Sequence, residues 1–306
     1  MKAEVLALKK LIDFLISNGI SFEENADGSR FCSFRVGGPI RVVVRPTCVT
    51  QLKSVYKFLE ANNIRNILLG KGSNVLIGDG GFDGVVVLTS EMKNMTRAGS
   101  CIEVSAGASM TALSSVAQSY GLTGLEFAHG IPGSVGGGIY MNAGAYGGEI
   151  SQVLYSCVCF DKENDTLVEF NNSKCQFSYR HSIFQENKNL ILLWARFELG
   201  EANKGEIKAK MDEQKAMRIA KQPLEYPSAG STFKRPKDDF AGRLIEAAGL
   251  KGFSIGGAQV SEKHAGFVIN RGGATADDIK KLIEHIQKTV KEKFNVLLEC
   301  EIEFVE

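Results

Sequence analysis

Two glycine-rich tracts are the first feature of this sequence that could do chemistry. The chain has 306 residues and 33 glycines, about 11% where roughly 7% is usual. Residues 70–84 hold six of these glycines and residues 121–148 hold ten, so sixteen lie within 43 residues. Glycine permits tight turns, and it also lets bare backbone N–H groups approach a ligand such as a phosphate. Density alone leaves both interpretations open.

The first tract contains the sequence G-K-G-S-N at residues 70–74, which can be tested against two known phosphate-binding motifs. A P-loop requires a glycine where this chain has Arg65, and the Rossmann fingerprint requires a third glycine where it has Val75. The tract therefore fits neither motif. It still places consecutive N–H groups and a hydroxyl at the end of a strand, which suits a pyrophosphate; a plain turn is the alternative.

Short strands and amphipathic helices must position these tracts. An N-terminal surface helix is indicated by the spacing of Leu8, Leu11 and Leu15. Strands are predicted at residues 41–45, 67–69, 75–77, 85–88, 102–105, 153–160, 166–170, 190–199, 266–269 and 296–305. Helices are predicted at residues 50–62, 110–120 and 240–248, from Lys204 to before Pro223, and after a capping Thr275.

Composition and charge exclude several classes of protein. The chain is 44% hydrophobic and 23% charged, which is typical of soluble globular proteins and excludes disorder, collagen and coiled coil. A net charge of +1 argues against nucleic-acid binding. Lys9 and Lys10 interrupt the apolar N-terminal segment, and no apolar run is long enough for a membrane span, so we expect neither export nor membrane insertion. Seven scattered cysteines without a C-x-x-C pair predict no disulfides and no metal site, which favours the cytoplasm.

The second tract belongs to an ordered set of motifs. The chain carries G-x-G-S-N, G-I-P-G-S-x-G-G and M-N-A-G-A-Y-G-G, followed by Y-R-H-S at 179–182, K-Q-P at 221–223, G-S-T-F-K at 230–234 and V-S-E-K-H-A-G-F at 260–267. Together these motifs resemble the UDP-N-acetylenolpyruvoylglucosamine reductases, the MurB family, over nearly the whole chain. The resemblance implies an α+β protein with a two-subdomain FAD-binding fold of the vanillyl-alcohol-oxidase type and a C-terminal α+β substrate-binding domain.

The resemblance also implies where non-covalent FAD binds. We expect FAD-binding subdomains over residues 1–90 and 91–202 and the substrate-binding domain over residues 203–306. The first tract would hold the pyrophosphate and the second would line the flavin. The expected cofactor-binding residues are Gly70, Lys71, Gly72, Ser73, Asn74, Gly130, Ile131, Pro132, Gly133, Ser134, Gly136, Gly137, Asn142, Gly144 and Ala145.

The family's reaction indicates which further groups are needed. It reduces the enolpyruvyl ether of a UDP-sugar to a lactyl ether for peptidoglycan precursors, with NADPH reducing FAD and flavin N5 delivering hydride to the methylene carbon. Negative charge then develops on the substrate carboxylate, so a cation is needed there and a proton donor at the adjacent carbon. The motif matches imply Arg180 as the carboxylate-polarising cation and Ser231 as the proton donor.

The third catalytic group implied by the resemblance is a glutamate near the C-terminus. Apolar and acidic residues alternate in residues 298–304, so we expect Glu299, Glu301 and Glu303 on one face of the last strand, a pattern usually found on the solvent side. Matching the family's L-E-P-E-V-R assigns the catalytic role to Glu301, although Cys300 and Glu303 depart from that pattern. Glu299 stays the alternative.

Three basic residues are expected at the diphosphate of the substrate. Lys221 matches a family lysine that contacts this group, and Lys234 and Arg235 lie beside Ser231 in the sequence. Some flavoproteins of this fold attach FAD covalently through histidine, so His129 beside the second tract could be interpreted that way. We interpret His129 and His264 as structural residues.

The expected partners are small molecules: the UDP-sugar and NADPH. We expect a monomer that binds neither nucleic acid nor membranes. The interval of 51 positions between Arg180 and Ser231 resembles the family's shorter subtype, so no tyrosine lid is assigned. Two other hypotheses are a different FAD-dependent oxidoreductase of the same fold and a non-catalytic flavin-binding protein. The combination of Arg180, Ser231 and Glu301 argues against both.

Overall fold

The structure, a computed structural model, describes residues 2–306 of the chain and the side chains from Leu6 onward. The described residues form two units, each of three segments. Unit 1 consists of the residues up to Glu23, Val42–Lys71 and Gly84–Ala216, and unit 2 consists of Glu24–Arg41, Gly72–Asp83 and Met217–Glu306. The subdomain boundaries expected at residues 90 and 202 stay a prediction.

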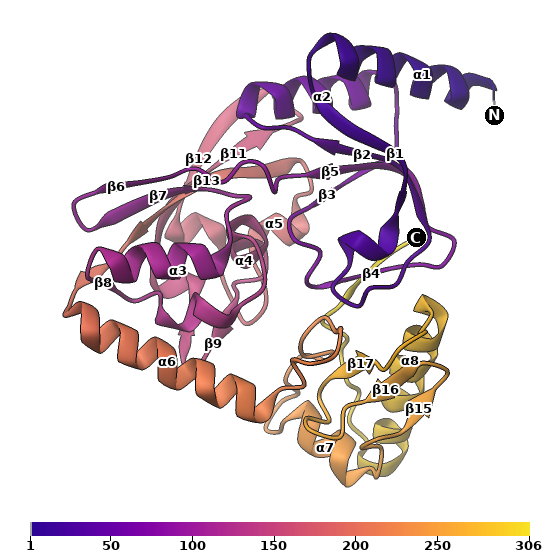
Figure 1. The fold of residues 1–306 in the computed structure, drawn as a ribbon, viewed down its shortest axis with the longest axis vertical. Coiled ribbons are helices and arrows are strands. Elements are labelled where there is room, and N and C mark those ends of the chain that lie inside the picture. The colour runs from indigo at the N-terminus through magenta and orange to yellow at the C-terminus, as the bar shows by residue number, and fades with distance from the viewer. Residues whose placement is uncertain (1) are drawn as a thin grey trace. The chain divides into compact units, whose positions relative to one another are not determined.

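A four-stranded sheet carries the two N-terminal helices on one side (Figure 1). Its strands, in spatial order, are β1 (Ser21–Asp27), β2 (Pro39–Arg45), β5 (Phe82–Leu88) and β3 (Asn66–Leu69), with β3 parallel to β5. Helices α1 (Lys2–Ser17) and α2 (Val49–Ala61) bury the apolar residues that recur at helical spacing, among them Leu11, Leu15 and Leu52. The rings of Phe14 and Phe58 stack between the two helices with centroids 4.6 Å apart.

A five-stranded antiparallel sheet forms the larger part of unit 1. Its strands, in spatial order, are β12 (Thr166–Asn171), β11 (Leu154–Asp161), β13 (Leu190–Glu198), β7 (Cys101–Ser105) and β6 (Met95–Ala98). Helices α3 (Met110–Ser119) and α4 (Val135–Tyr140) lie beside this sheet (Figure 1). They share its apolar core, which includes Ile102, Leu113 and Val135. The second glycine tract is therefore built onto this core.

Several short elements and one long helix, α6, complete this part of the chain. They are β8 (Leu122–Thr123), η2 (Glu126–Gly130), β9 (Gly144–Ala145), β10 (Gly148–Glu149), η3 (Ile150–Gln152), η4 (Asn172–Cys175), α5 (Ile183–Glu186), β14 (Gly200–Glu201) and α6 (Lys204–Lys221). The buried carboxylate of Glu126 accepts hydrogen bonds from Thr123 Oγ1 and Gly124 N–H and lies 3.7 Å from Lys210 Nζ of α6. Within the described residues, no helix is both long and apolar enough to cross a bilayer.

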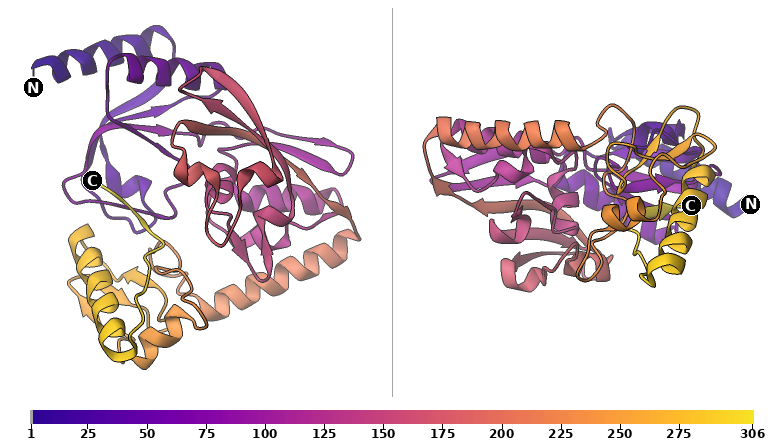
Figure 2. Two further views of the ribbon diagram at one scale, coloured as in Figure 1. Left: turned by 180° about the vertical axis from the view of Figure 1, so that it is seen from behind. Right: turned by 90° about the horizontal axis from the view of Figure 1, so that it is seen from below.

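Unit 2 contains a three-stranded sheet with a long helix against it (Figures 1 and 2). The elements of this unit are η1 (Gly28–Phe31), β4 (Val75–Ile77), α7 (Ala241–Ala247), β15 (Ser254–Ile255), β16 (Ala258–Val260), β17 (Val268–Asn270), α8 (Ala276–Phe294) and β18 (Glu303–Val305). Thr275 caps the start of α8, as the sequence predicts, and the structure adds Asp278 as its partner in a capping box. Strand β18 pairs in parallel with β4, so residues far apart in the chain meet here.

Most predicted helices and strands are confirmed, and one strand is wrong in extent. The structure has helices or strands at the predicted places, with β4 matching residue for residue. The strand predicted over residues 296–305 is limited to Glu303–Val305, preceded by an isolated bridge between Cys300 and Phe233. Among the described residues, only 303–305 of this segment pair with a neighbouring strand, β4. The alternation of acidic and apolar residues over 298–304 therefore extends beyond the strand and does not define its length.

The loop after β4 is tied to α8 by one carboxylate. Asp79 accepts hydrogen bonds from the N–H groups of Ala276 (2.8 Å) and Asp277 (2.9 Å), which are free donors at a helix start. We predict that Asp79→Ala lowers the free energy of unfolding by about 1 kcal/mol, the usual cost of losing a helix cap, in denaturant titrations followed by circular dichroism.

Asp83→Ala is the matched control, because Asp83 forms an exposed ion pair with Arg41 and does not cap a helix among the described residues. Such pairs contribute between about 0 and 1 kcal/mol, so we expect little change. Equal stability of the Asp79→Ala variant and the wild-type protein would show that this cap contributes nothing.

Candidate active site

The loop between β3 and β4 holds the first glycine tract, and two of its glycines lie in close contact with other parts of the protein. A Cβ at Gly70 would lie 2.1 Å from Oγ of Ser134, which belongs to the second tract. Gly72 has a φ of +61°, and a Cβ there would lie 1.8 Å from the carbonyl oxygen of Phe31. Both distances are far below van der Waals contact. Because the neighbour of Gly72 is backbone and its φ is positive, packing demands glycine there, whereas a side chain at Gly70 would require the Ser134 hydroxyl or the loop to move.

The same loop offers donors to a ligand. Within the part of the chain that the structure describes, the backbone N–H groups of residues 70–73 donate to no protein acceptor. Consecutive N–H groups around a left-handed residue form a concave arrangement that binds anions. The loop therefore fits the pyrophosphate of an extended dinucleotide such as FAD, and its glycines serve packing as well.

The second glycine tract is anchored to the five-stranded core. Ser134 caps α4 by accepting a hydrogen bond from the N–H of Gly137 at 3.2 Å. The N–H of Gly136 donates to the carbonyl of Ala106 at 2.7 Å, so the start of α4 lies directly on the end of β7. After α4 the chain forms the hairpin of β9 and β10. These bonds fix the tract; which of its residues contact FAD stays a prediction.

Arg180 lies in a turn of unit 1 with an uncommon backbone conformation. Its φ is +55°, in the left-handed region that residues with a side chain seldom adopt. The turn is closed by reciprocal backbone hydrogen bonds between Ser178 and His181, both 3.2 Å long. The guanidinium of Arg180 donates from Nη2 to the carbonyl of Gly144 at 3.1 Å, which joins this turn to the second glycine tract. Arg180 is therefore partly buried and lies in a turn, not in a strand.

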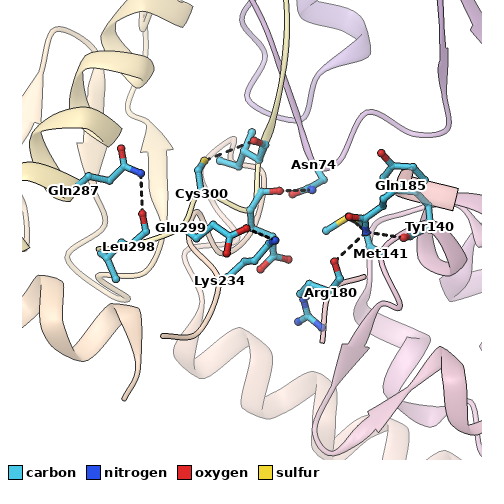
Figure 3. Close-up of polar contacts among 12 residues, drawn as sticks. Asn74, Tyr140, Met141, Arg180, Gln185, Lys234, Gln287, Leu298, Glu299 and Cys300 are labelled. Atoms are coloured by element: carbon cyan, nitrogen blue, oxygen red, sulfur yellow. Dashed lines mark hydrogen bonds and ion pairs between the residues drawn. The ribbon is translucent and has the colours of Figure 1, made fainter. Parts of the chain in front are cut away.

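One residue that holds this turn was not found from the sequence. The side-chain amide of Gln185 donates to the carbonyls of Arg180 (3.0 Å) and Tyr140 (2.8 Å) (Figure 3). Gln185 lies in a short helix and belongs to none of the motifs found in the sequence. Its role follows from its hydrogen bonds to two carbonyls, one of which is 45 positions away in the chain.

In unit 2, Ser231 and Glu301 are joined through Thr232. Ser231 is exposed and follows Gly230, whose φ is +79°. Its neighbour Thr232 is fully buried, donates its N–H to the carbonyl of Gly266 (2.9 Å) and accepts the N–H of Glu301 on its own carbonyl (2.9 Å). The structure thus brings these two predicted residues together. Thr232 had no signal in the sequence beyond its place in the motif.

The backbone around Glu301 is held on two sides, and the two candidate glutamates differ. Asn74 donates from Nδ2 to the carbonyl of Glu301 at 2.8 Å (Figure 3). Glu301 is half-buried, whereas the side chain of Glu299 is 70% exposed and forms an ion pair with Lys234 (Figure 3). The expectation that Glu299, Glu301 and Glu303 share one face of a single strand is wrong, because the residues before Glu303 are not in a continuous strand.

The three predicted diphosphate ligands all lie in unit 2. Lys221 is the exposed last residue of α6, and Lys234 is partly buried beside Glu299. The guanidinium of Arg235 lies 4.7 Å from the centroid of the Phe240 ring. All three side chains are cations that could bind a phosphate, and their roles stay predictions.

The two histidines of interest are both partly buried. Burial, with a smaller contribution from Lys215 and Lys208, lowers the pKa of His129. Burial also lowers the pKa of His264, whose Nδ1 accepts the N–H of Gly266 at 3.1 Å. Since Gly266 accepts from Thr232, His264 supports the backbone next to Ser231.

Two family models match this chain. Residues 40–162 match an FAD binding domain, and residues 222–305 match the C-terminal domain of UDP-N-acetylenolpyruvoylglucosamine reductase. The first range includes both glycine tracts, and the second includes Ser231 and Glu301. These matches confirm the predicted fold class and FAD as the cofactor.

Curated proteins and a solved structure are similar over almost the full length. UDP-N-acetylenolpyruvoylglucosamine reductase from Latilactobacillus sakei is 46% identical over 97% of this chain and 98% of its own. The protein of that name from Caldanaerobacter subterraneus is 49% identical over 92% of both chains. The crystal structure of the reductase from Thermus caldophilus is 32% identical, with a TM-score of 0.79 over 94% of this chain and 99% of its own.

The contact between Gly70 and Ser134 leads to a prediction about cofactor binding. Gly70→Ala places a methyl group 2.1 Å from Ser134 Oγ, so the loop or the Ser134 hydroxyl must move, and FAD content should fall. Ser134→Ala removes this hydroxyl and leaves the Ser134 Cβ at 3.1 Å, so adding Gly70→Ala to Ser134→Ala should lower FAD content less than adding it to the wild-type protein. Absorbance of the purified variants measures this.

Gly80→Ala is the control, because a Cβ there meets nothing within 4 Å. A full complement of FAD in the Gly70→Ala variant would contradict the prediction.

Proposed function

Because the chain belongs to the UDP-N-acetylenolpyruvoylglucosamine reductases, we propose that it reduces UDP-N-acetylglucosamine enolpyruvate to UDP-N-acetylmuramate with NADPH as the reductant. The chain is an FAD-containing oxidoreductase of peptidoglycan precursor synthesis. When bound, FAD accepts hydride from NADPH and supplies hydride to the methylene carbon of the substrate. The residues of this chain bind the substrate, stabilise the charge that develops and supply the proton.

In this proposal Arg180 binds the substrate carboxylate. Hydride addition at the methylene carbon places negative charge on the adjacent carbon and its carboxylate, which a guanidinium can bind through two parallel hydrogen bonds. A donor already in place before the charge develops stabilises it most, because little reorganisation is then needed. The hydrogen bond from Arg180 Nη2 to Gly144 supports this role, since it restricts the orientation of the guanidinium.

Ser231 is proposed to protonate the carbon next to the carboxylate. A serine hydroxyl is a weak acid near neutral pH, so it can act only on a strongly basic, enolate-like carbon and only from hydrogen-bond distance. Exposure of Ser231 leaves its hydroxyl accessible to a substrate. The buried backbone of Thr232 beside it restricts where the hydroxyl can lie.

Glu301 is proposed to act with Arg180 on the developing charge. The observation that carries the mechanistic part of the proposal is the hydrogen bond from Glu301 N–H to Thr232 O, which couples this glutamate to the backbone of the serine motif. Glu299 is a poorer candidate, because its carboxylate is exposed and paired with Lys234.

The remaining binding roles follow from charge. Lys221, Lys234 and Arg235 are proposed to bind the substrate's diphosphate, since each offers a cationic donor to a doubly charged group. FAD is proposed to be bound without a covalent bond, with residues 70–74 at its pyrophosphate. The unpaired N–H donors of residues 70–73 among the described residues support this arrangement.

The two half-reactions can be measured separately, which tests Ser231. We predict that Ser231→Ala is reduced by NADPH at a rate within about threefold of wild type, while its anaerobic re-oxidation by the enolpyruvyl sugar slows by about 100-fold or more, the usual scale for losing a general acid. Stopped-flow absorbance of the flavin follows both steps.

Ser228→Ala is the matched control, because Ser228 lies in the same loop and has no proposed role. Equal damage to both half-reactions in Ser231→Ala would show a structural role for the hydroxyl. Unchanged re-oxidation would remove Ser231 from the mechanism.

The two glutamates can be distinguished by one pair of variants. We predict that Glu301→Gln slows re-oxidation by the enolpyruvyl sugar at least about tenfold, because a neutral amide changes the electrostatics at the reacting group. Glu299→Gln, which removes only an exposed ion pair, should leave this rate nearly unchanged. The opposite ranking would transfer the role to Glu299.

A further inference from the structure

Asn142 was predicted to bind the cofactor, but its side chain forms hydrogen bonds with other residues of unit 1. The residue is fully buried, and Nδ2 donates to the carbonyl of Ser178 (3.0 Å) and to Oε1 of Glu149 (3.1 Å). Oδ1 accepts the N–H of Ser151 at 2.9 Å. Both amide hydrogens and the amide oxygen are therefore paired with groups of unit 1.

The bond to Ser178 acts on the turn that carries Arg180. Ser178 and His181 close this turn, and Arg180 within it has a φ of +55°. A left-handed residue with a side chain costs free energy and persists only where surrounding contacts hold it. Asn142 holds the turn on one side through Ser178 O, and Gln185 holds it on the other through Arg180 O.

The same set of bonds joins the turn to the second glycine tract at several points. Besides Asn142, the carbonyl of Tyr140 accepts hydrogen bonds from Gln185 Nε2 and from Ser182 Oγ (2.7 Å), and the carbonyl of Gly144 accepts from Arg180. The tract and the turn are therefore one hydrogen-bonded structure, and its buried centre is the amide of Asn142.

We propose that Asn142 is the positioning residue of Arg180: its amide fixes the turn at residues 178–181 so that the guanidinium is oriented before substrate binds. This inference rests on the proposed function, because it concerns the group assigned to the substrate carboxylate. It assigns to the Asn142 side chain a role other than contact with the flavin. Misplacing a reacting group by about 1 Å can reduce a rate by about 100-fold, so such a role has a measurable effect.

The test is a double-mutant cycle read in separate half-reactions. Asn142→Gly removes the amide and tolerates the positive φ of 41° at this position. We expect wild-type FAD content and reduction by NADPH within about twofold of wild type, but a raised KM for the enolpyruvyl sugar and re-oxidation slower by about 10- to 100-fold. In an Arg180→Ala background, Asn142→Gly should change re-oxidation by less than about twofold, because its effect is exerted through Arg180.

The control is Asn172→Ala, which also removes an amide that donates to two carbonyls, those of Ser151 (2.7 Å) and Leu154 (2.8 Å). Among the described residues its amide has no hydrogen bond to residues 178–181, so the substitution should leave both half-reactions unchanged. If Asn142→Gly does not fold, Gln185→Met removes the other anchor of the turn and is measured in the same cycle with Arg180→Ala.

The outcomes separate the inference from the function on which it rests. Loss of FAD in Asn142→Gly, or additive effects of the two substitutions, would overturn the positioning role. If Arg180→Ala itself re-oxidises normally, the proposed role of Arg180 fails instead. Slow re-oxidation in both single variants, with no further loss in the double variant, supports both.

Discussion

The site depends on one physical constraint: polar groups that are shielded from water must be paired inside the protein. The predicted catalytic residues lie on turns and loops, which keep one shape only where such pairing fixes their backbone. In unit 1 the amide of Asn142 is fully buried and fully paired, and it holds the turn of Arg180. In unit 2 the buried Thr232 fixes the backbone beside Ser231 and Glu301 through the hydrogen bonds of its N–H and carbonyl groups.

The local sequence pattern predicts helices and strands correctly where neighbouring residues in the chain determine them. The capping Thr275 and the apolar spacing of α8 predict that helix, and β4 was predicted with its observed bounds. The strand over residues 296–305 was overestimated because alternating residues carry no information about a partner strand, and only residues 303–305 have one. The residues that hold the site in place, Thr232 and Gln185, were missed for a related reason, since their partners are distant in sequence.

The glycine surplus has two physical causes in this structure. Gly72 is required by its close approach to backbone and Gly70 lies against the Ser134 side chain, which is the structural explanation that the composition left open. The N–H groups of residues 70–73 find no acceptor among the described residues, which is what a phosphate-binding loop needs. Both explanations therefore apply, and the second is consistent with the match of residues 40–162 to an FAD binding domain.

The most direct measurement of the proposed function is a product balance. The purified protein is mixed anaerobically with NADPH and the enolpyruvyl UDP-sugar, and the sugar is analysed by mass spectrometry while NADPH absorbance is followed. The proposal predicts that each molecule of NADPH oxidised yields one molecule of UDP-sugar heavier by two hydrogen atoms. Oxidation of NADPH with the enolpyruvyl sugar unchanged would contradict it.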